Sequence, residues 1–178
     1  ASNTYEIDAH WALYCENYLE GLHIAYVHKG LSSDIDNQSY ETTLLEHAVL
    51  QMAKSKDKKN SLGEIGKING VPINEVYALY FWLFPNIMIN FYKWGISVNI
   101  IEPLGKEKTK IRFISLPIKG NKQSSGDNNS VDHIELEDQK VVLDVQKGIK
   151  SKFYDSGRYS AEHEKGTHYF HQLISKYI

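Results

Sequence analysis

The chain has 178 residues, of which 42% are apolar and 24% charged, a composition typical of one globular domain with a sizeable core. Its net charge of -2 offers no basic field for nucleic acid, and no apolar stretch reaches the roughly 20 residues that span a membrane. The single cysteine, Cys15, excludes an intramolecular disulfide and favours a reducing compartment, so we expect a cytoplasmic protein.

The first third of the chain predicts mixed secondary structure. Residues 4–8 predict a short strand, and residues 9–22 predict a helix because apolar side chains recur there at helical spacing. The core-facing stripe of this helix consists of Trp11, Tyr14, Cys15, Tyr18 and Leu22. Residues 28–38 are polar and predict a loop, whereas residues 40–53 favour a strand over a helix.

The remaining residues predict a run of strands followed by two helices. Residues 56–72 are polar and glycine-rich, which indicates a loop. Apolar segments joined by short turns then predict antiparallel strands at 76–85, 87–94, 96–103 and 109–118. A second polar loop at 119–130 precedes a long helix at 131–152, and a last helix begins near Ser160 as its N-cap. Strands grouped between segregated helices predict an α+β fold, with an antiparallel sheet curled around a long helix.

Asp138 is the unusual residue of the long predicted helix. The apolar residues Ile134, Val141, Val142, Val145 and Ile149 form one stripe, and Asp138 lies within it. A carboxylate on a core-facing stripe is unfavourable unless it is paired or bound to a metal ion. Alternatively the helix begins at Asp138, where the carboxylate caps backbone N–H groups. The helix alone leaves both interpretations open.

Two histidines, His23 and His28, lie five positions apart after the first predicted helix. Residues five apart point away from each other on a regular helix, and the known zinc motif places its histidines four apart. The pair can converge only if the helix ends between them or contains a π-bulge. Glu20 lies three residues before His23, and Asn17 three before Glu20. The plainer interpretation of residues 16–20 is a solvated polar helix face.

Taken together, these residues resemble the motifs of one known protein family. The segment "ENYLEGLHIAYVH" resembles the mononuclear iron motif of Rieske-type non-haem iron oxygenases, the α-subunits of ring-hydroxylating dioxygenases and related monooxygenases. The motif positions are similar to Asn17, Glu20, His23 and His28. The later segment "EDQKVVLDVQKG" is similar to the part of the family that carries the third ligand, Asp138, and a marker glutamine, Gln146. The resemblance covers nearly the whole chain and implies a helix-grip fold with a pocket between sheet and helix.

The resemblance implies a chemistry for each of these residues. His23, His28 and Asp138 would hold a mononuclear Fe(II), and this ligand set leaves positions open for dioxygen and a small organic substrate. Donor softness alone would also suit zinc. Glu20 would connect the iron to a Rieske [2Fe–2S] cluster of a neighbouring subunit. A glutamate there is familiar among choline- and carnitine-type monooxygenases, which favours a quaternary ammonium substrate over an aromatic one.

The cysteine count constrains the domain organisation. A Rieske cluster needs two cysteines and two histidines, whereas this chain has one cysteine. We therefore expect residues 1–178 to form the mononuclear-iron catalytic domain, with the Rieske domain before Ala1 and absent from these residues. The resemblance further implies electrons from NAD(P)H through a reductase or ferredoxin, and a homotrimeric full-length protein. We expect the domain alone to be inactive without them.

Two alternatives from other classes stay open. The first is a metal-free ligand-binding domain of the same helix-grip architecture, and the second is a zinc hydrolase in which Glu20 acts as general base. His168 and His171 lie three apart on the last predicted helix, where a surface or packing role is expected. No supporting pattern surrounds His10, His47, His133 and His163.

Overall fold

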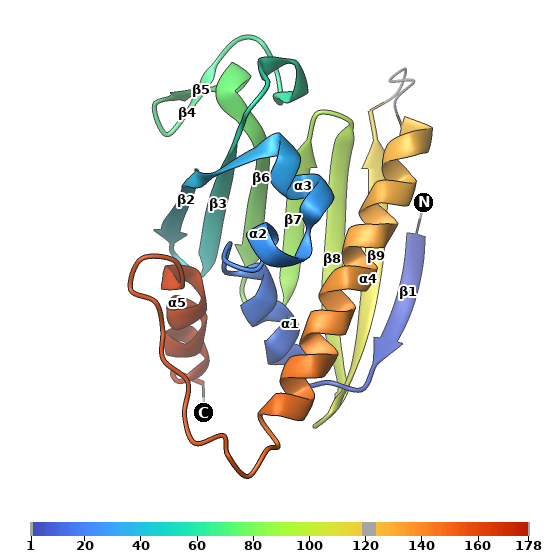
Figure 1. The fold of residues 1–178 in the computed structure, drawn as a ribbon, viewed down its shortest axis with the longest axis vertical. Helices are drawn as coiled ribbons and strands as arrows, with labels where there is room; N and C mark the ends of the chain where they lie inside the picture. Colours follow the sequence, from blue (N-terminus) through green and yellow to red (C-terminus); the bar gives the residue numbers. More distant parts are fainter. Residues whose placement is uncertain (1, 119–123, 178) are drawn as a thin grey trace.

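This computed structural model describes residues 2–118 and 124–177, and the side chains of all of these except Lys29, Asn37 and residues 124–132. A seven-stranded antiparallel sheet in the order β1-β9-β8-β7-β6-β3-β2 forms one layer (Figure 1). Its strands are β1 (Ser2–Ile7), β2 (Ile35–Leu45), β3 (Ala48–Ser55), β6 (Val76–Leu83), β7 (Ile87–Tyr92), β8 (Gly95–Gly105) and β9 (Lys108–Pro117). A separate hairpin consists of β4 (Lys67–Ile68) and β5 (Val71–Pro72).

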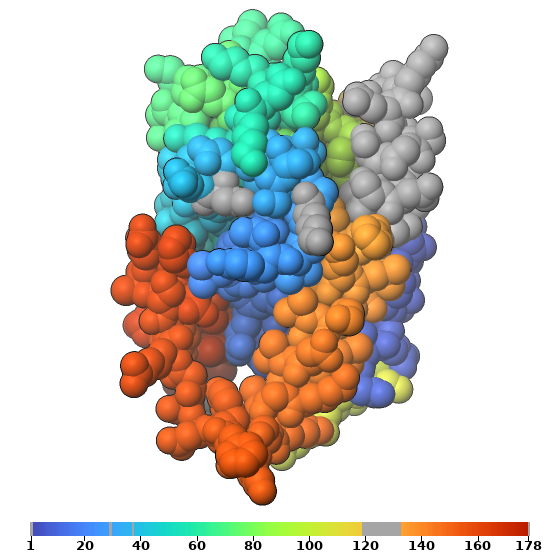
Figure 2. Space-filling model, viewed as in Figure 1, coloured from blue at the N-terminus to red at the C-terminus, as the bar shows by residue number. Residues whose placement is uncertain are grey.

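The helices lie on one face of the sheet (Figure 1). They are α1 (Trp11–Tyr18), α2 (Ile24–Val27), α3 (Lys29–Asp34), α4 (Ser124–Gly148) and α5 (Lys165–Ile174), with 3-10 turns η1 (Lys58–Asn60) and η2 (Ile73–Glu75). From the same side, Figure 2 shows atoms of the segment around α2, in blue, between those of α4 in orange and α5 in red. None of the described helices is long and apolar enough to cross a lipid bilayer.

Strands β6 to β9 form a meander in which each strand pairs with the next. Short turns connect them, so each hairpin is set by local sequence. Gly95 begins β8 with a φ of 154°, and a Cβ atom there would lie 2.8 Å from the Cα of Pro117 on the paired strand. Only glycine fits this close approach. The predicted α+β fold, with an antiparallel sheet around a long helix, is confirmed.

The main core lies between the sheet and helices α1, α4 and α5. Trp82 of β6 and Phe170 of α5 are fully buried and meet edge to face, with ring centroids 5.3 Å apart. Val142 contributes from α4. Cys15 of α1 is also fully buried, and its sulfur lies 3.9 Å from the carbonyl oxygen of Pro85. Burial raises the pKa of the Cys15 thiol.

The first helix is shorter than predicted. It ends at Tyr18 instead of residue 22, and the side-chain amide of Gln51 donates to the Tyr18 carbonyl oxygen over 2.7 Å. A partner from β3 therefore satisfies a carbonyl group at the helix end. Leu22 is 38% exposed, so its predicted place on the core stripe is wrong.

Several predicted loops contain regular structure. The predicted loop at 28–38 holds α3 and the start of β2, and residues 40–53 form a hairpin in which His47 has a φ of 56°. The polar segment 56–72 includes η1 and the small β4–β5 hairpin. Of the predicted loop 119–130, residues 119–123 lie outside the described residues, and from Ser124 the backbone is helical. Polar composition is a weak signal against a helix.

Helix α4 begins well before Asp138, so the interpretation of Asp138 as an N-cap is wrong. The predicted apolar stripe is also partly wrong, because Val145 is 42% exposed and Ile149 lies beyond the helix. Among residues 133–148 of α4, the buried ones are Glu135, Val142 and Gln146. They are spaced so that they share a face with Asp138, which makes the inward face of this helix largely polar.

The last helix begins at Lys165, five residues after the predicted N-cap Ser160. The Ser160 hydroxyl accepts from the backbone N–H of His163, while the Glu164 carboxylate accepts from the backbone N–H of Ser160. These bonds close a turn ahead of the helix. The N-cap signature at Ser160 therefore marks the turn before α5 instead of its first residue.

Candidate metal centre

The two histidines occupy the two ends of a very short helix. After α1 ends, His23 takes the N-cap position of α2 and His28 its C-cap position. At His28 the backbone turns out of helical geometry, with a ψ of 74°, and α3 follows. The two imidazole rings lie 5.0 Å apart, centroid to centroid, at 81° to each other. A break in the helix, not a π-bulge, therefore brings residues five apart together.

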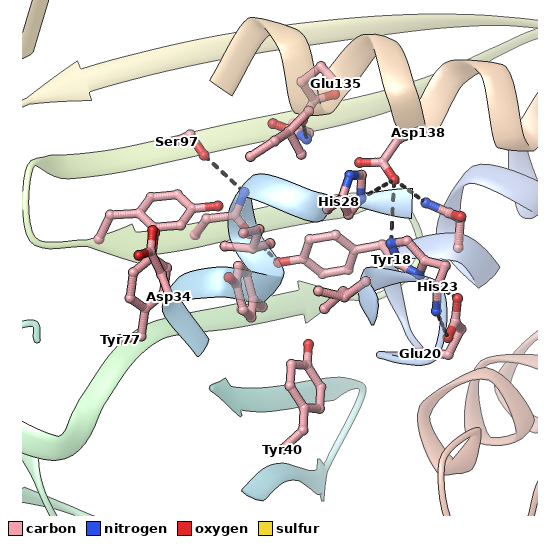
Figure 3. A pocket seen from close by; sticks show the side chains of 18 of the residues that line it. Tyr18, Glu20, His23, His28, Asp34, Tyr40, Tyr77, Ser97, Glu135 and Asp138 are labelled. Carbon is pink, nitrogen blue, oxygen red and sulfur yellow. Dashed lines mark hydrogen bonds and ion pairs between the residues drawn. The ribbon is translucent and has the colours of Figure 1, made fainter. Parts of the chain in front are cut away.

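Asp138 reaches the same point from α4 (Figure 3). Its Oδ1 lies 3.0 Å from Nε2 of His28 and 3.4 Å from Nε2 of His23. Asn17 of α1 donates its side-chain N–H to this oxygen over 2.8 Å. One donor atom each of His23, His28 and Asp138 lies within 4.8 Å of the other two. The structure thus brings together four of the residues named from sequence.

Each imidazole contacts a second carboxylate at its Nδ1 atom. Oε1 of Glu20 lies 2.5 Å from Nδ1 of His23, and Oε2 of Glu137 lies 2.8 Å from Nδ1 of His28. Each carboxylate accepts a hydrogen bond from the Nδ1–H group and so directs Nε2 toward Asp138. The carboxylate of Glu20 also accepts the backbone N–H of His23, over 3.2 Å, which fixes the turn before α2. Sequence reasoning did not assign this role to Glu137, although it adjoins Asp138.

The charges of the centre are strongly coupled. Burial alone would lower the pKa of both histidines, but hydrogen bonds to Asp138 and to the second carboxylates outweigh it. The pKa of His23 rises to about 9, and that of His28 also rises. Burial would raise the pKa of Asp138, whereas its bonds to both histidines lower it to about 2. Ligation requires neutral imidazole, so a metal ion would displace protons here.

The donor set fits a divalent transition metal ion. Donor atoms at right angles, about 2.1 Å from one ion, lie about 3 Å apart, which agrees with the 3.0 and 3.4 Å between Asp138 and the histidines. His28 is 2% exposed, while the side chains of His23 and Asp138 are 14% and 16% exposed. Two imidazoles and one carboxylate are the ligands of non-haem Fe(II) oxygenases.

The centre opens into a cavity of about 350 Å³ between the helices and the sheet. In Figure 3 the histidines lie at one end, Asp34 and Tyr77 lie toward the other, and Tyr40 faces the cavity from across. The aromatic lining is formed by Tyr14, Tyr18, Tyr40, Tyr77, Tyr80, Tyr92 and Trp94. Inner-face positions of β7 and β8 add the amides of Asn90 and Asn99 and the hydroxyl of Ser97.

Glu135 is a cavity residue that the sequence reasoning missed. It is 6% exposed, and its carboxylate accepts from the hydroxyl of Tyr14 over 2.5 Å and from the side-chain amide of Asn99 over 2.9 Å. Burial and the charge of Asp138 raise the pKa of Glu135 to about 7, against the opposing effect of these two bonds. Its position three residues before Asp138 placed it on the same helix face, which was the available signal.

The other residues named from sequence lie outside the centre. Gln146 is buried, and its Oε1 accepts the backbone N–H of His10 over 2.7 Å, which joins α4 to the start of α1. His171 of α5 lies with Nε2 2.8 Å from Oε1 of Glu16. His133 of α4 is largely exposed. These histidines have packing or surface positions.

Curated relatives align with almost the whole chain. Choline monooxygenase of Arabidopsis thaliana is 35% identical in an alignment of 178 positions that covers 96% of this chain and 40% of the relative. The oxygenase subunit of carnitine monooxygenase from Escherichia coli K12 is 26% identical in an alignment of 185 positions that covers 94% of this chain and 46% of the relative. The chain therefore spans less than half the length of these relatives.

Solved structures share the fold. A quaternary ammonium Rieske monooxygenase superposes with a TM-score of 0.82 at 23% identity, over 99% of this chain and 49% of the other. Naphthalene 1,2-dioxygenase from Rhodococcus sp. superposes with a TM-score of 0.70 at 14% identity, over 99% of this chain and 55% of the other. A family model described as "Ring hydroxylating alpha subunit (catalytic domain)" matches residues 1–178. The chain belongs to this family of catalytic domains.

Proposed function

We propose that the chain is the mononuclear-iron domain of a Rieske-type monooxygenase that oxidises a small quaternary ammonium compound. The observation that carries this proposal is the convergence of His23, His28 and Asp138 at one end of an aromatic-lined cavity. Such a ligand set leaves positions open beside the substrate cavity. The names of the relatives, choline and carnitine monooxygenases, point to the same class of substrate.

In this proposal His23, His28 and Asp138 hold Fe(II), and the bound iron supplies the activation of dioxygen. Asn17 orients the Asp138 carboxylate by donating to Oδ1. Glu20 and Glu137 accept hydrogen bonds from the Nδ1–H groups of the two histidines, which keeps each Nε2 available as a ligand. The family resemblance assigns Glu20 a second task, the electronic connection to a Rieske [2Fe–2S] cluster of another subunit.

The aromatic lining suits a cation that has no N–H donors. Tyr40 and Tyr80 stack with ring centroids 6.4 Å apart, and Tyr92 and Trp94 stack at 5.3 Å. The face of an aromatic ring attracts a quaternary ammonium group through its quadrupole. The same rings exclude water from the substrate, which strengthens electrostatic contacts inside the cavity.

The proposal extends to parts beyond these residues. We infer that residues 1–178 act with a Rieske domain in the full-length protein, that a reductase delivers electrons from NAD(P)H, and that the subunits form a homotrimer. A cytoplasmic location stays a prediction, and the plant relatives are described as chloroplastic.

Anaerobic loading with Fe(II), followed by desalting and measurement of iron, tests the site. We expect one iron per chain in the wild type and loss of iron in His23→Ala and in Asp138→Ala, because each variant removes one of three ligands. His163→Ala is the control, since His163 is exposed and lies outside the centre. Unchanged iron in both ligand variants would contradict the assignment. A wild type that takes up no iron would favour a metal-free ligand-binding domain.

A further inference from the structure

Glu135 places a carboxylate in the cavity wall with neutral hydrogen-bond partners. Its two oxygens accept from the hydroxyl of Tyr14 and the amide of Asn99, and neither donor carries a charge. Lys93 also lines the cavity, and its ammonium group donates to the carbonyl oxygen of Lys59. A buried carboxylate is unfavourable unless a positive charge or sufficient hydrogen bonds compensate it. The charge of His28 opposes the burial of Glu135, and a cationic ligand in the cavity would add to that compensation.

Asn99 provides an independent observation beside Glu135. It is 2% exposed and lines the cavity, and its Oδ1 has no hydrogen-bond partner among the residues that the structure describes. Buried amide oxygens are nearly always paired with a donor. A buried acceptor without a protein partner, in a side chain that lines the cavity, points to a donor on the ligand. The same amide donates its N–H to Glu135, so the two groups are adjacent.

Resting on the proposed function, we propose that Glu135 and Asn99 determine substrate specificity and select a short quaternary ammonium alcohol. The Glu135 carboxylate attracts the ammonium charge, and Oδ1 of Asn99 accepts a hydrogen bond from the substrate hydroxyl. A molecule with its hydroxyl two carbons from the nitrogen can reach two adjacent groups. A carboxylate in place of the hydroxyl would meet the Glu135 charge and the lone pairs of Asn99.

The physical roles of ring faces and carboxylate are complementary. Tyrosine and tryptophan faces contact the methyl groups of a quaternary ammonium ion, whereas Glu135 acts on its net charge. Burial raises the pKa of Glu135 to about 7, and a cation in the cavity opposes that effect because it stabilises the charged carboxylate. Tyr14 holds the carboxylate in place through its hydroxyl.

The test measures binding to the iron-loaded protein by calorimetry, without oxygen or reductant. The probes are choline and its uncharged carbon analogue 3,3-dimethylbutan-1-ol. We expect the wild type to bind choline roughly 10- to 100-fold more tightly than the analogue, the range for one charged contact. Glu135→Gln should remove most of that ratio and leave the affinity for the analogue unchanged. Asp144→Asn, at an exposed carboxylate of the same helix, should keep the ratio.

A second comparison isolates Asn99. Tetramethylammonium carries the charge of choline without its hydroxyl. Asn99→Ala should weaken choline binding several-fold and leave tetramethylammonium binding unchanged, because the lost contact is to the hydroxyl. Glycine betaine, which has a carboxylate at the corresponding position, should bind the wild type more weakly than choline. Equal affinity for choline and glycine betaine would overturn the proposed selection.

The outcomes separate this inference from the proposed function. A wild type that does not prefer choline to its analogue would overturn the proposed substrate class. If the wild type prefers choline and Glu135→Gln keeps the same preference, the role of Glu135 is overturned while the proposed substrate class stands. Glu135→Gln is expected to fold, since its carbonyl oxygen can keep the bond from Asn99 while the Tyr14 hydroxyl rotates and accepts from the new amide group. If it does not fold, Tyr14→Phe combined with Glu135→Met removes the buried pair at similar volume and gives the same comparison.

Discussion

The pKa of Glu135 makes the stability of the protein depend on pH in a defined window. The pKa of this carboxyl is 4.5 for the unperturbed group and about 7 in the folded protein. Between these values the folded state binds a proton that the unfolded state has released, so stability falls as pH rises. At 1.36 kcal/mol for each pH unit between the two pKa values, the total loss is about 3 kcal/mol.

Most of this loss, about 2.5 kcal/mol, falls between pH 5 and pH 8. Glu135→Gln removes the ionisable group, so its unfolding free energy should fall less across this range. Urea unfolding at pH 5, 6, 7 and 8 measures the difference between the two proteins. Subtracting one curve from the other cancels the contribution of His23, whose raised pKa also lowers stability as pH rises from about 6.5 to 9.

Asp144→Asn serves as the control, because Asp144 is an exposed carboxylate on the same helix. Its pH profile should run parallel to that of the wild type. Parallel profiles for the wild type and Glu135→Gln would refute the reasoning, since the folded and unfolded states would then bind protons equally at this position. A wild type that becomes more stable than Glu135→Gln as pH rises would refute it as well.

Two further predictions concern packing. A Cβ atom on Gly166 would lie 2.6 Å from the carbonyl oxygen of Leu19, so Gly166→Ala should destabilise the protein by about 1–3 kcal/mol in urea unfolding, whereas Gly148→Ala, which has open space, should not. Phe170→Ala should cost about 3–5 kcal/mol because the ring is fully buried, while Phe153→Ala at an 86% exposed ring should change stability by less than about 0.5 kcal/mol. Equal effects within either pair would contradict the packing described.

Local sequence was sufficient to predict the strands of the meander. Each hairpin from β6 to β9 joins neighbours in sequence, so alternation of apolar residues and short turns contain the necessary information. The end of α1 was different. It coincides with a bond from Gln51 to the Tyr18 carbonyl, across 33 residues, and no local pattern predicts such a partner.

The candidate centre was also predictable from the sequence only in part. His23, His28 and Asp138 were predicted from two segments that resemble the family, and the structure places these three residues together. The surroundings of Glu135 could not be predicted, because its partner Tyr14 lies 121 residues away and Asn99 lies 36 residues away. Helix periodicity placed Glu135 beside Asp138, yet only the folded chain shows that its carboxylate faces the cavity with neutral partners.

The burial of Cys15 provides an internal reporter of unfolding. It is the single cysteine of the chain, and its side chain has no exposed surface. An alkylating reagent can therefore reach the thiol only when α1 separates from the sheet, so the rate of modification measures how often this part of the molecule opens. Mass spectrometry can follow that single adduct without any engineered label, and a ligand that slows its appearance binds the closed form.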